Sequence, residues 1–106
     1  MIDISLGNDR FILTEECYQY SKGERLRFSG DMINDLKVEF MNEGQPAAGE
    51  ACSPDEMGVI RIPDRYFESG ENVIAYAVLT GQSGDVQTRY KITIPVTPRS
   101  RRGARP

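Results

Sequence analysis

The 106-residue sequence contains no histidine, no tryptophan and only two cysteines. Histidine is the commonest general base and a frequent metal ligand, so its absence argues against acid–base catalysis. The serines therefore have no histidine to activate them as nucleophiles. Two cysteines are too few for a four-ligand zinc site. We therefore predict a protein that is not an enzyme, with no catalytic residue, no metal site and no cofactor.

Long hydrophobic runs are also missing. The longest apolar run, residues 73–79, is far shorter than the ~20 residues that span a bilayer. Asp3 stands where a signal peptide would carry basic residues. We therefore expect no membrane association and synthesis in a cytoplasm, where disulfides are rare. Cys17 and Cys52 are predicted to be free thiols, and the alternative is a disulfide that closes a 36-residue loop.

Strand-forming residues dominate the composition. Val, Ile and Thr number 20, against 15 for the helix formers Ala, Leu and Met. Residues 86–96 alternate, with apolar or β-branched side chains at even positions, which predicts a strand with one buried face. Pro95 cannot donate to a ladder, so the strand should end at a sheet edge or leave the sheet there. Residues 73–79 are apolar on both faces, which is typical of a central strand.

Shorter patterns complete the expected fold. Clear alternation predicts strands at residues 25–29, 36–40 and 59–62, and weaker signals mark residues 2–6, 11–13 and 18–20. A short edge strand is expected within residues 45–56, and a helical turn within residues 63–70, which begin with Pro and end with Gly. We therefore predict an all-β, immunoglobulin-like antiparallel β-sandwich of seven or eight strands with one short helical turn.

Charge divides the chain into a body, residues 1–98, and an extended basic C-terminal tail, residues 99–106. The body holds nine Lys or Arg and sixteen Asp or Glu, a net charge of −7. The tail holds no acid and four arginines, which are Arg99, Arg101, Arg102 and Arg105. Such a tail is typical of an interaction segment, and we assign these four arginines as partner-binding residues. An acidic body repels nucleic acid and anionic membranes.

The second half of the chain resembles a group of small phage domains. The resemblance covers about residues 24–102 and rests on four features: Ile60-Arg61-Ile62-Pro63, residues 73–79 with Tyr76, Thr88-Arg89-Tyr90, and Ile94-Pro95-Val96 before the basic tail. These immunoglobulin-like domains occur at the N-termini of baseplate and tail-appendage proteins, and as small virion proteins of phages and prophages. The Cys–Trp–Cys core of antibody domains is missing.

The resemblance implies a virion structural protein, either a capsid decoration or a tail or baseplate component. It would be assembled in the host cytoplasm, present in multiple copies or as a homo-oligomer, and attached to capsid or tail proteins through its termini and sheet edges. The alternative is a carbohydrate-binding adhesion module on a phage or cell surface, which would present a patch of exposed tyrosines. The paired acids Glu15–Glu16 and Asp55–Glu56 are predicted to be turn charges.

Overall fold

The structure, a computed structural model, describes residues 1–30, 35–45, 51–80 and 87–99. The regular secondary structure of these residues is mainly strand, with the 3-10 turn η2 (Asp64–Phe67), so the all-β prediction is confirmed. None of the described residues belongs to a helix long and apolar enough to cross a membrane.

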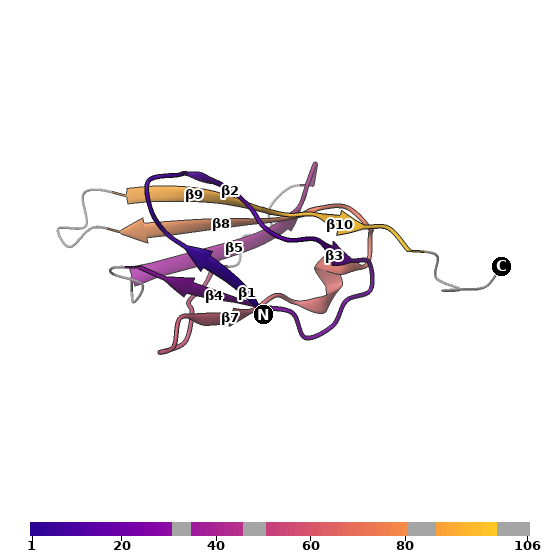
Figure 1. The fold of residues 1–106 in the computed structure, drawn as a ribbon, viewed down its shortest axis with the longest axis horizontal. Helices are drawn as coiled ribbons and strands as arrows, with labels where there is room; N and C mark the ends of the chain where they lie inside the picture. Colours follow the sequence, from indigo (N-terminus) through magenta and orange to yellow (C-terminus); the bar gives the residue numbers. More distant parts are fainter. Residues whose placement is uncertain (31–34, 46–50, 81–86, 100–106) are drawn as a thin grey trace.

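Three sheets make up the described part of the chain (Figure 1). The smaller sheet has the order β1-β4-β7 and consists of β1 (Ile2–Ser5), β4 (Arg25–Ser29) and β7 (Val59–Arg61). The larger sheet has the order β2-β9-β8-β5-β6 and consists of β2 (Phe11–Leu13), β9 (Gln87–Ile94), β8 (Val73–Thr80), β5 (Leu36–Asn42) and β6 (Ala51–Cys52). A two-stranded sheet joins β10 (Val96–Thr97) to β3 (Cys17–Tyr18).

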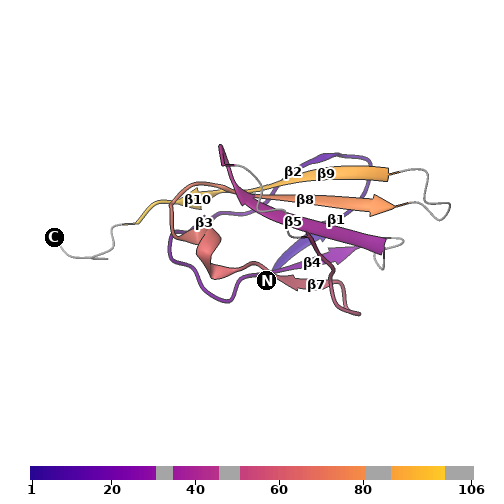
Figure 2. The same cartoon turned by 180° about the vertical axis from the view of Figure 1, so that it is seen from behind.

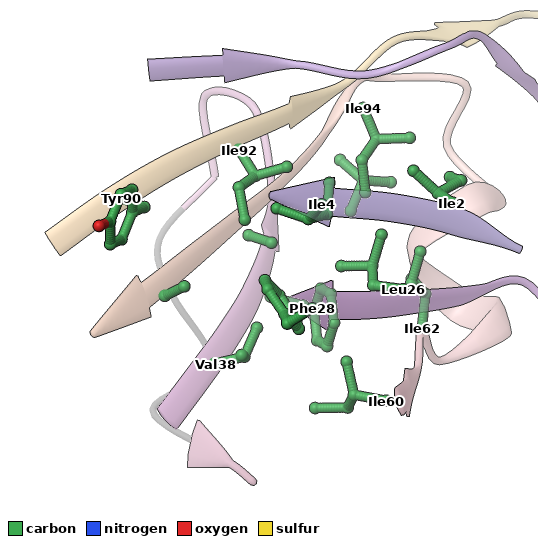
Figure 3. Packing of buried hydrophobic residues seen from close by; sticks show 14 of the residues in the cluster. Ile2, Ile4, Leu26, Phe28, Val38, Ile60, Ile62, Tyr90, Ile92 and Ile94 are labelled. Atoms are coloured by element: carbon green, nitrogen blue, oxygen red, sulfur yellow. The ribbon is translucent and has the colours of Figure 1, made fainter. Parts of the chain in front are cut away.

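The smaller and larger sheets face each other across one core. Figures 1 and 2 show β1, β4 and β7 on one side of the molecule and β2, β9 and β8 on the other. The inward positions alternate along each strand, and they bury Leu26 and Phe28 of β4 together with Ile92 and Ile94 of β9. Figure 3 shows Ile4 and Phe28 lying between the two sheets with Ile92. Alternation therefore places one face of each sheet in the core, as the sequence predicts.

The turn η2 covers one end of this core. Phe67 is completely buried, and the Tyr66 ring lies 6.1 Å from the ring of Phe40. The Asn42 side-chain amide donates to the Tyr66 carbonyl oxygen over 2.7 Å, which attaches the turn to the end of β5. The helical turn predicted within residues 63–70 is therefore present, with Pro63 immediately before its first residue.

The strand pairing differs from the prediction in one respect. An antiparallel arrangement was expected, but three pairs are parallel: β1 with β4, β2 with β9, and β10 with β3. The central ladders, β5 with β8 and β8 with β9, are antiparallel. Period-two alternation reports only which face a side chain occupies, so it carries no information about the direction of a partner strand that is distant in sequence.

Strand number and boundaries also differ from the prediction. The described residues form ten strands rather than seven or eight, and Pro95 divides the expected strand 86–96 into β9 and β10. The edge strand expected within residues 45–56 is present as β6 (Ala51–Cys52). The strand expected at 18–20 is instead Cys17–Tyr18, since Tyr20 has a φ of 68° and turns the chain. The expected hairpin loop at residues 81–85 lies outside the described residues.

Candidate functional site

The root of the Arg-rich tail is built by the two-stranded sheet. Pro95 has no N–H, and the chain leaves the β8 ladder there, as predicted. The Pro95 carbonyl oxygen instead accepts from the Cys17 N–H at 2.8 Å, and the Thr97 carbonyl oxygen accepts from the Gln19 N–H at 2.9 Å. The Asn72 side-chain oxygen accepts from the Val96 N–H at 3.0 Å. The segment before the tail is thus held on both sides.

Gln19 joins this root to the turn η2. Its side-chain nitrogen donates to the Glu68 carbonyl oxygen at 2.7 Å, and its side-chain oxygen accepts from the Arg99 N–H at 2.8 Å. The amide fits closely against Gly70, where an added Cβ would lie 3.1 Å from it. Gly70 also has a φ of +78°, which favours glycine. Gln19 therefore fixes where the first residue of the tail leaves the body.

Of the four arginines assigned to partner binding, Arg99 is described, and Arg101, Arg102 and Arg105 lie outside the described residues. Arg99 is exposed, and its guanidinium carbon lies 5.6 Å from the centroid of the Tyr18 ring. Tyr18 is itself 48% exposed. Neither ion pair of the described residues, Arg27–Asp3 and Arg61–Asp64, involves Arg99. Its charge is therefore open to an anionic partner beside the ring.

A second surface lies on the larger sheet, and the sequence analysis did not identify it. We call it the outer face: the side chains of the larger sheet that point away from the core. Its rows follow from the strand register, and the row Phe11, Lys91, Tyr76, Glu39 and Ala51 crosses all five strands. The next row contains Leu13, Thr93, Ile74 and Met41. Phe11, Leu13, Tyr76 and Met41 thus contribute apolar or aromatic surface to this face, whereas Ile74 is itself buried.

The outer face is hollowed near its β6 edge. A hollow of about 390 Å³ is lined by Lys37, Glu39, Met41, Ala51, Tyr76, Val78 and Arg89. The Lys37 ammonium donates to the Ser53 hydroxyl at 2.8 Å, and the Arg89 guanidinium carbon lies 5.7 Å from the Tyr76 ring centroid. The hollow therefore combines an apolar floor with two cations and one carboxylate.

At the opposite edge of the same face, two large side chains stand in solvent. Phe11 is 79% exposed and Leu13 is 73% exposed, and both point outward because Ile12 between them packs against the core. Two exposed apolar side chains on one short strand, next to further apolar residues, mark an interaction surface more often than isolated ones do. The apolar outward positions of β8 are the one signal of this face in the sequence, but apolar residues on both faces are equally typical of a central strand, which is how the sequence analysis interprets them.

Two of the four paired acids accept hydrogen bonds from nearby groups. One Asp55 carboxylate oxygen accepts from the N–H groups of Met57 and Val59, at 2.8 and 2.9 Å. A Glu16 carboxylate oxygen accepts from the Thr97 hydroxyl. These contacts agree with the prediction of turn chemistry for Asp55, and they place Glu16 at the root of the tail.

The five tyrosines belong to different elements or turns of the fold. Tyr90 is buried, whereas Tyr18, Tyr66 and Tyr76 belong to β3, η2 and β8 respectively. Tyr20 follows β3 in the turn that precedes β4. The ring pair observed among the described residues joins Tyr66 to Phe40, not to a second tyrosine. The described tyrosines therefore come from several elements, although Tyr18, Tyr20 and Tyr66 lie on neighbouring segments, because the Tyr20 N–H donates to the Phe67 carbonyl oxygen at 3.0 Å.

The two cysteines differ in environment. Both are free thiols, with Cys17 buried and Cys52 exposed on the edge strand β6. Burial, together with the nearby Glu24 carboxylate, raises the pKa of the Cys17 thiol to about 11. Cys17 is therefore an inert core residue, while Cys52 is open to solvent.

No family model, curated protein or solved structure matches the chain. The assignment of function consequently rests on the geometry described above.

Proposed function

We propose that this chain is a non-enzymatic structural protein of a bacteriophage virion, a capsid decoration or a tail or baseplate component, that attaches through its Arg-rich tail. On this proposal the fold is an immunoglobulin-like β-sandwich, in which the smaller and larger sheets are the two layers. The resemblance of the second half of the chain to small phage domains supports this reading.

The observation that carries the proposal is the root of the tail. The chain leaves the larger sheet at Pro95 and continues as β10. Gln19 and Tyr18 then hold the backbone and side chain of Arg99 at the surface. These contacts fix the point on the surface at which the tail begins. Arginine forks bind carboxylates with two parallel hydrogen bonds, so an acidic groove on a capsid or tail protein is the complementary partner.

The energetics of this contact depend on burial. Each charge-assisted bond contributes ~1.5–3 kcal/mol where the groove is partly buried, and each exposed pair only ~0.2–1 kcal/mol. Four arginines on exposed carboxylates would thus bind weakly and in a salt-dependent way. Multiple copies on a particle would add avidity.

A carbohydrate-binding module is the alternative, and it has less support from the described residues. A sugar platform needs exposed aromatic faces side by side, whereas the ring pair among the described residues joins Tyr66 to the buried Phe40. The Tyr76 face is also occupied by Arg89.

Particle binding tests the proposal. Full-length protein, a variant lacking residues 99–106, and a variant with all four tail arginines changed to lysine would be produced during phage growth. Density-purified virions would then be probed for each by immunoblot. We expect full-length protein in the virion, loss of the truncated form, and reduced retention of the lysine variant at raised salt, because lysine keeps charge but not the fork. Absence of the full-length protein from virions would overturn the proposal.

A DNA titration separates a nucleic-acid arm from a protein-binding arm. Four neutralised phosphates would give a log–log salt slope of about −3.6 on duplex DNA. We expect no binding with that slope, because the body carries a net charge of −7.

A further inference from the structure

We propose that the outer face of the larger sheet binds a second copy of this chain about a two-fold axis, with Phe11 of each copy inserted into the hollow of the other. This contact uses no residue of the Arg-rich tail and does not depend on the virion assignment. It rests on three observations: the positions of Phe11 (the knob) and the hollow on the face, the strand register that places both in one row, and the charges of the residues around them.

The knob and the hollow lie at opposite edges of one face. Phe11 belongs to the edge strand β2, while the hollow is centred on β8 and β5 and closed by Ala51 of the other edge strand, β6. When two copies stack with these faces together about a two-fold axis parallel to the strands, the β2 edge of one copy lies over the β6 edge of the other. Each β2 then lies over the partner's β8, β5 and β6. The face is thus complementary to itself, as an isologous two-fold interface requires.

The rows of the sheet are also in the correct register. Phe11 pairs with Lys91, and the same row of paired residues runs on through Tyr76 and Glu39 to Ala51, which lines the hollow. A rotation about an axis parallel to the strands keeps the position of each residue along the strand direction. Phe11 of one copy therefore meets the row of Tyr76 and Ala51 in the other. Leu13 lies at the level of Thr93 and Met41, since Ile74 of the same row is already buried within its own copy.

Charges at the same end of the sheet match this arrangement. Lys37 and Arg89 line the hollow near the start of β9, and Lys91 lies in the row that crosses it. The hollow and this row contain one acid, Glu39, so positive charge prevails there. Asp9 is exposed and precedes Phe11 by two residues at that end. In the two-fold pair, Asp9 of each copy approaches the partner's cations. The basic tail has the wrong sign to occupy the hollow.

The area of the face indicates a weak dimer. Five strands ~4.8 Å apart and eight residues at ~3.4 Å each give a face of roughly 20 by 27 Å. Both copies together would then bury roughly 1,100 Å², which lies just below the ~1,200–2,000 Å² that stable specific interfaces bury. We therefore expect concentration-dependent association in the micromolar range or weaker, of the kind that many copies on one assembly would reinforce.

Sedimentation equilibrium of the full chain tests the contact. The intact protein should pass from monomer to dimer with rising concentration and stop there. Phe11→Ser should raise the dimer Kd at least about tenfold, because both knobs of the dimer are lost. Met57→Ser is the matched control, since Met57 is 75% exposed but lies outside the larger sheet, and its Kd should be unchanged. Deleting residues 99–106 should also leave the dimer intact.

A mixing experiment tests the knob-in-hollow geometry itself. Ala51→Arg places a long side chain across the hollow, where it can pair with Glu39 in the opposite strand position. This variant and Phe11→Ser should each dimerise poorly alone. Mixed together, they should form a heterodimer tighter than either homodimer, because the intact knob of one meets the intact hollow of the other. A monomer at every concentration, an unchanged Kd for Phe11→Ser, or the absence of this rescue would overturn the proposal.

Discussion

The two sheets share one core but present opposite outward faces. Away from the core, the smaller sheet carries Asp3, Arg25, Arg27 and Arg61, and the Arg27 guanidinium donates to the Asp3 carboxylate at 2.6 Å. The larger sheet carries Tyr76 and Val78 in its hollow, and Phe11 and Leu13 at the edge opposite the hollow. Folding requires an apolar inner face only, and the charged outward face of the smaller sheet meets that requirement fully. On the proposed two-fold contact, the apolar side chains on the outward face of the larger sheet bind the second copy.

The largest effects are expected where the sheets are alike, on their inner faces. Phe28→Ala of the smaller sheet and Ile92→Ala of the larger sheet should reduce the free energy of unfolding by ~3–5 and ~2–5 kcal/mol, since both side chains are buried. Lys91→Ala, next to Ile92 on the opposite face, should change it by no more than about 0.5 kcal/mol. Urea unfolding gives all three values. Equal losses for Ile92 and Lys91 would contradict the register, because a one-residue slip exchanges the faces.

A second difference separates the two thiols. With a pKa of about 11, Cys17 holds a thiolate fraction about 100-fold smaller at neutral pH than a thiol of pKa 9, in addition to its burial. Cys52, which is exposed, should therefore react with a disulfide reagent faster than the buried Cys17 in the native protein. Denaturation without reductant should release both thiols. Two equal native rates would contradict the buried position of Cys17.

The same thiol predicts a loss of stability in alkali. Its raised folded pKa means that the unfolded chain releases the proton first, so the stabilisation is fully present below about pH 9 and is lost as the pH rises toward about 11. The urea midpoint should fall across this window more steeply for the natural protein than for Cys17→Ala, in which this proton is absent. Parallel curves for the two proteins would place the Cys17 pKa at its ordinary value.

The smallest effects are expected on the two outward faces. Phe11→Ser on the larger sheet and Arg27→Ala on the smaller should each change the unfolding free energy of the monomer by no more than about 0.5 kcal/mol, because both side chains are exposed. Thermal unfolding at a concentration well below the dimer Kd provides the comparison. A large loss for Phe11→Ser would mean that this side chain supports the fold and not a contact.

The inward positions of both sheets were predictable from the sequence, whereas their outward contrast was not. Strict alternation located Leu26, Phe28, Ile92 and Ile94 in the core, and Pro95 located the break before β10. Strand direction escaped prediction because parallel pairs such as β2 with β9 join residues about eighty positions apart. The outer face escaped because a three-residue strand such as β2 has too few positions to show a pattern.

The tail was predicted in part. Composition alone identified the four arginines, and the structure adds how the first of them is held. Gln19 and Gly70 carry no local signal for this role, since their contact depends on two segments that meet only in the folded chain.

Amide NMR spectra of the natural protein at low and high concentration test the contrast between the sheets most directly. The account predicts that concentration-dependent shifts occur on β2, β9, β8 and β5, around Phe11 and the hollow, and that β1, β4 and β7 remain unchanged. Shifts centred on β4 and β7, or spectra independent of concentration on both sheets, would contradict it.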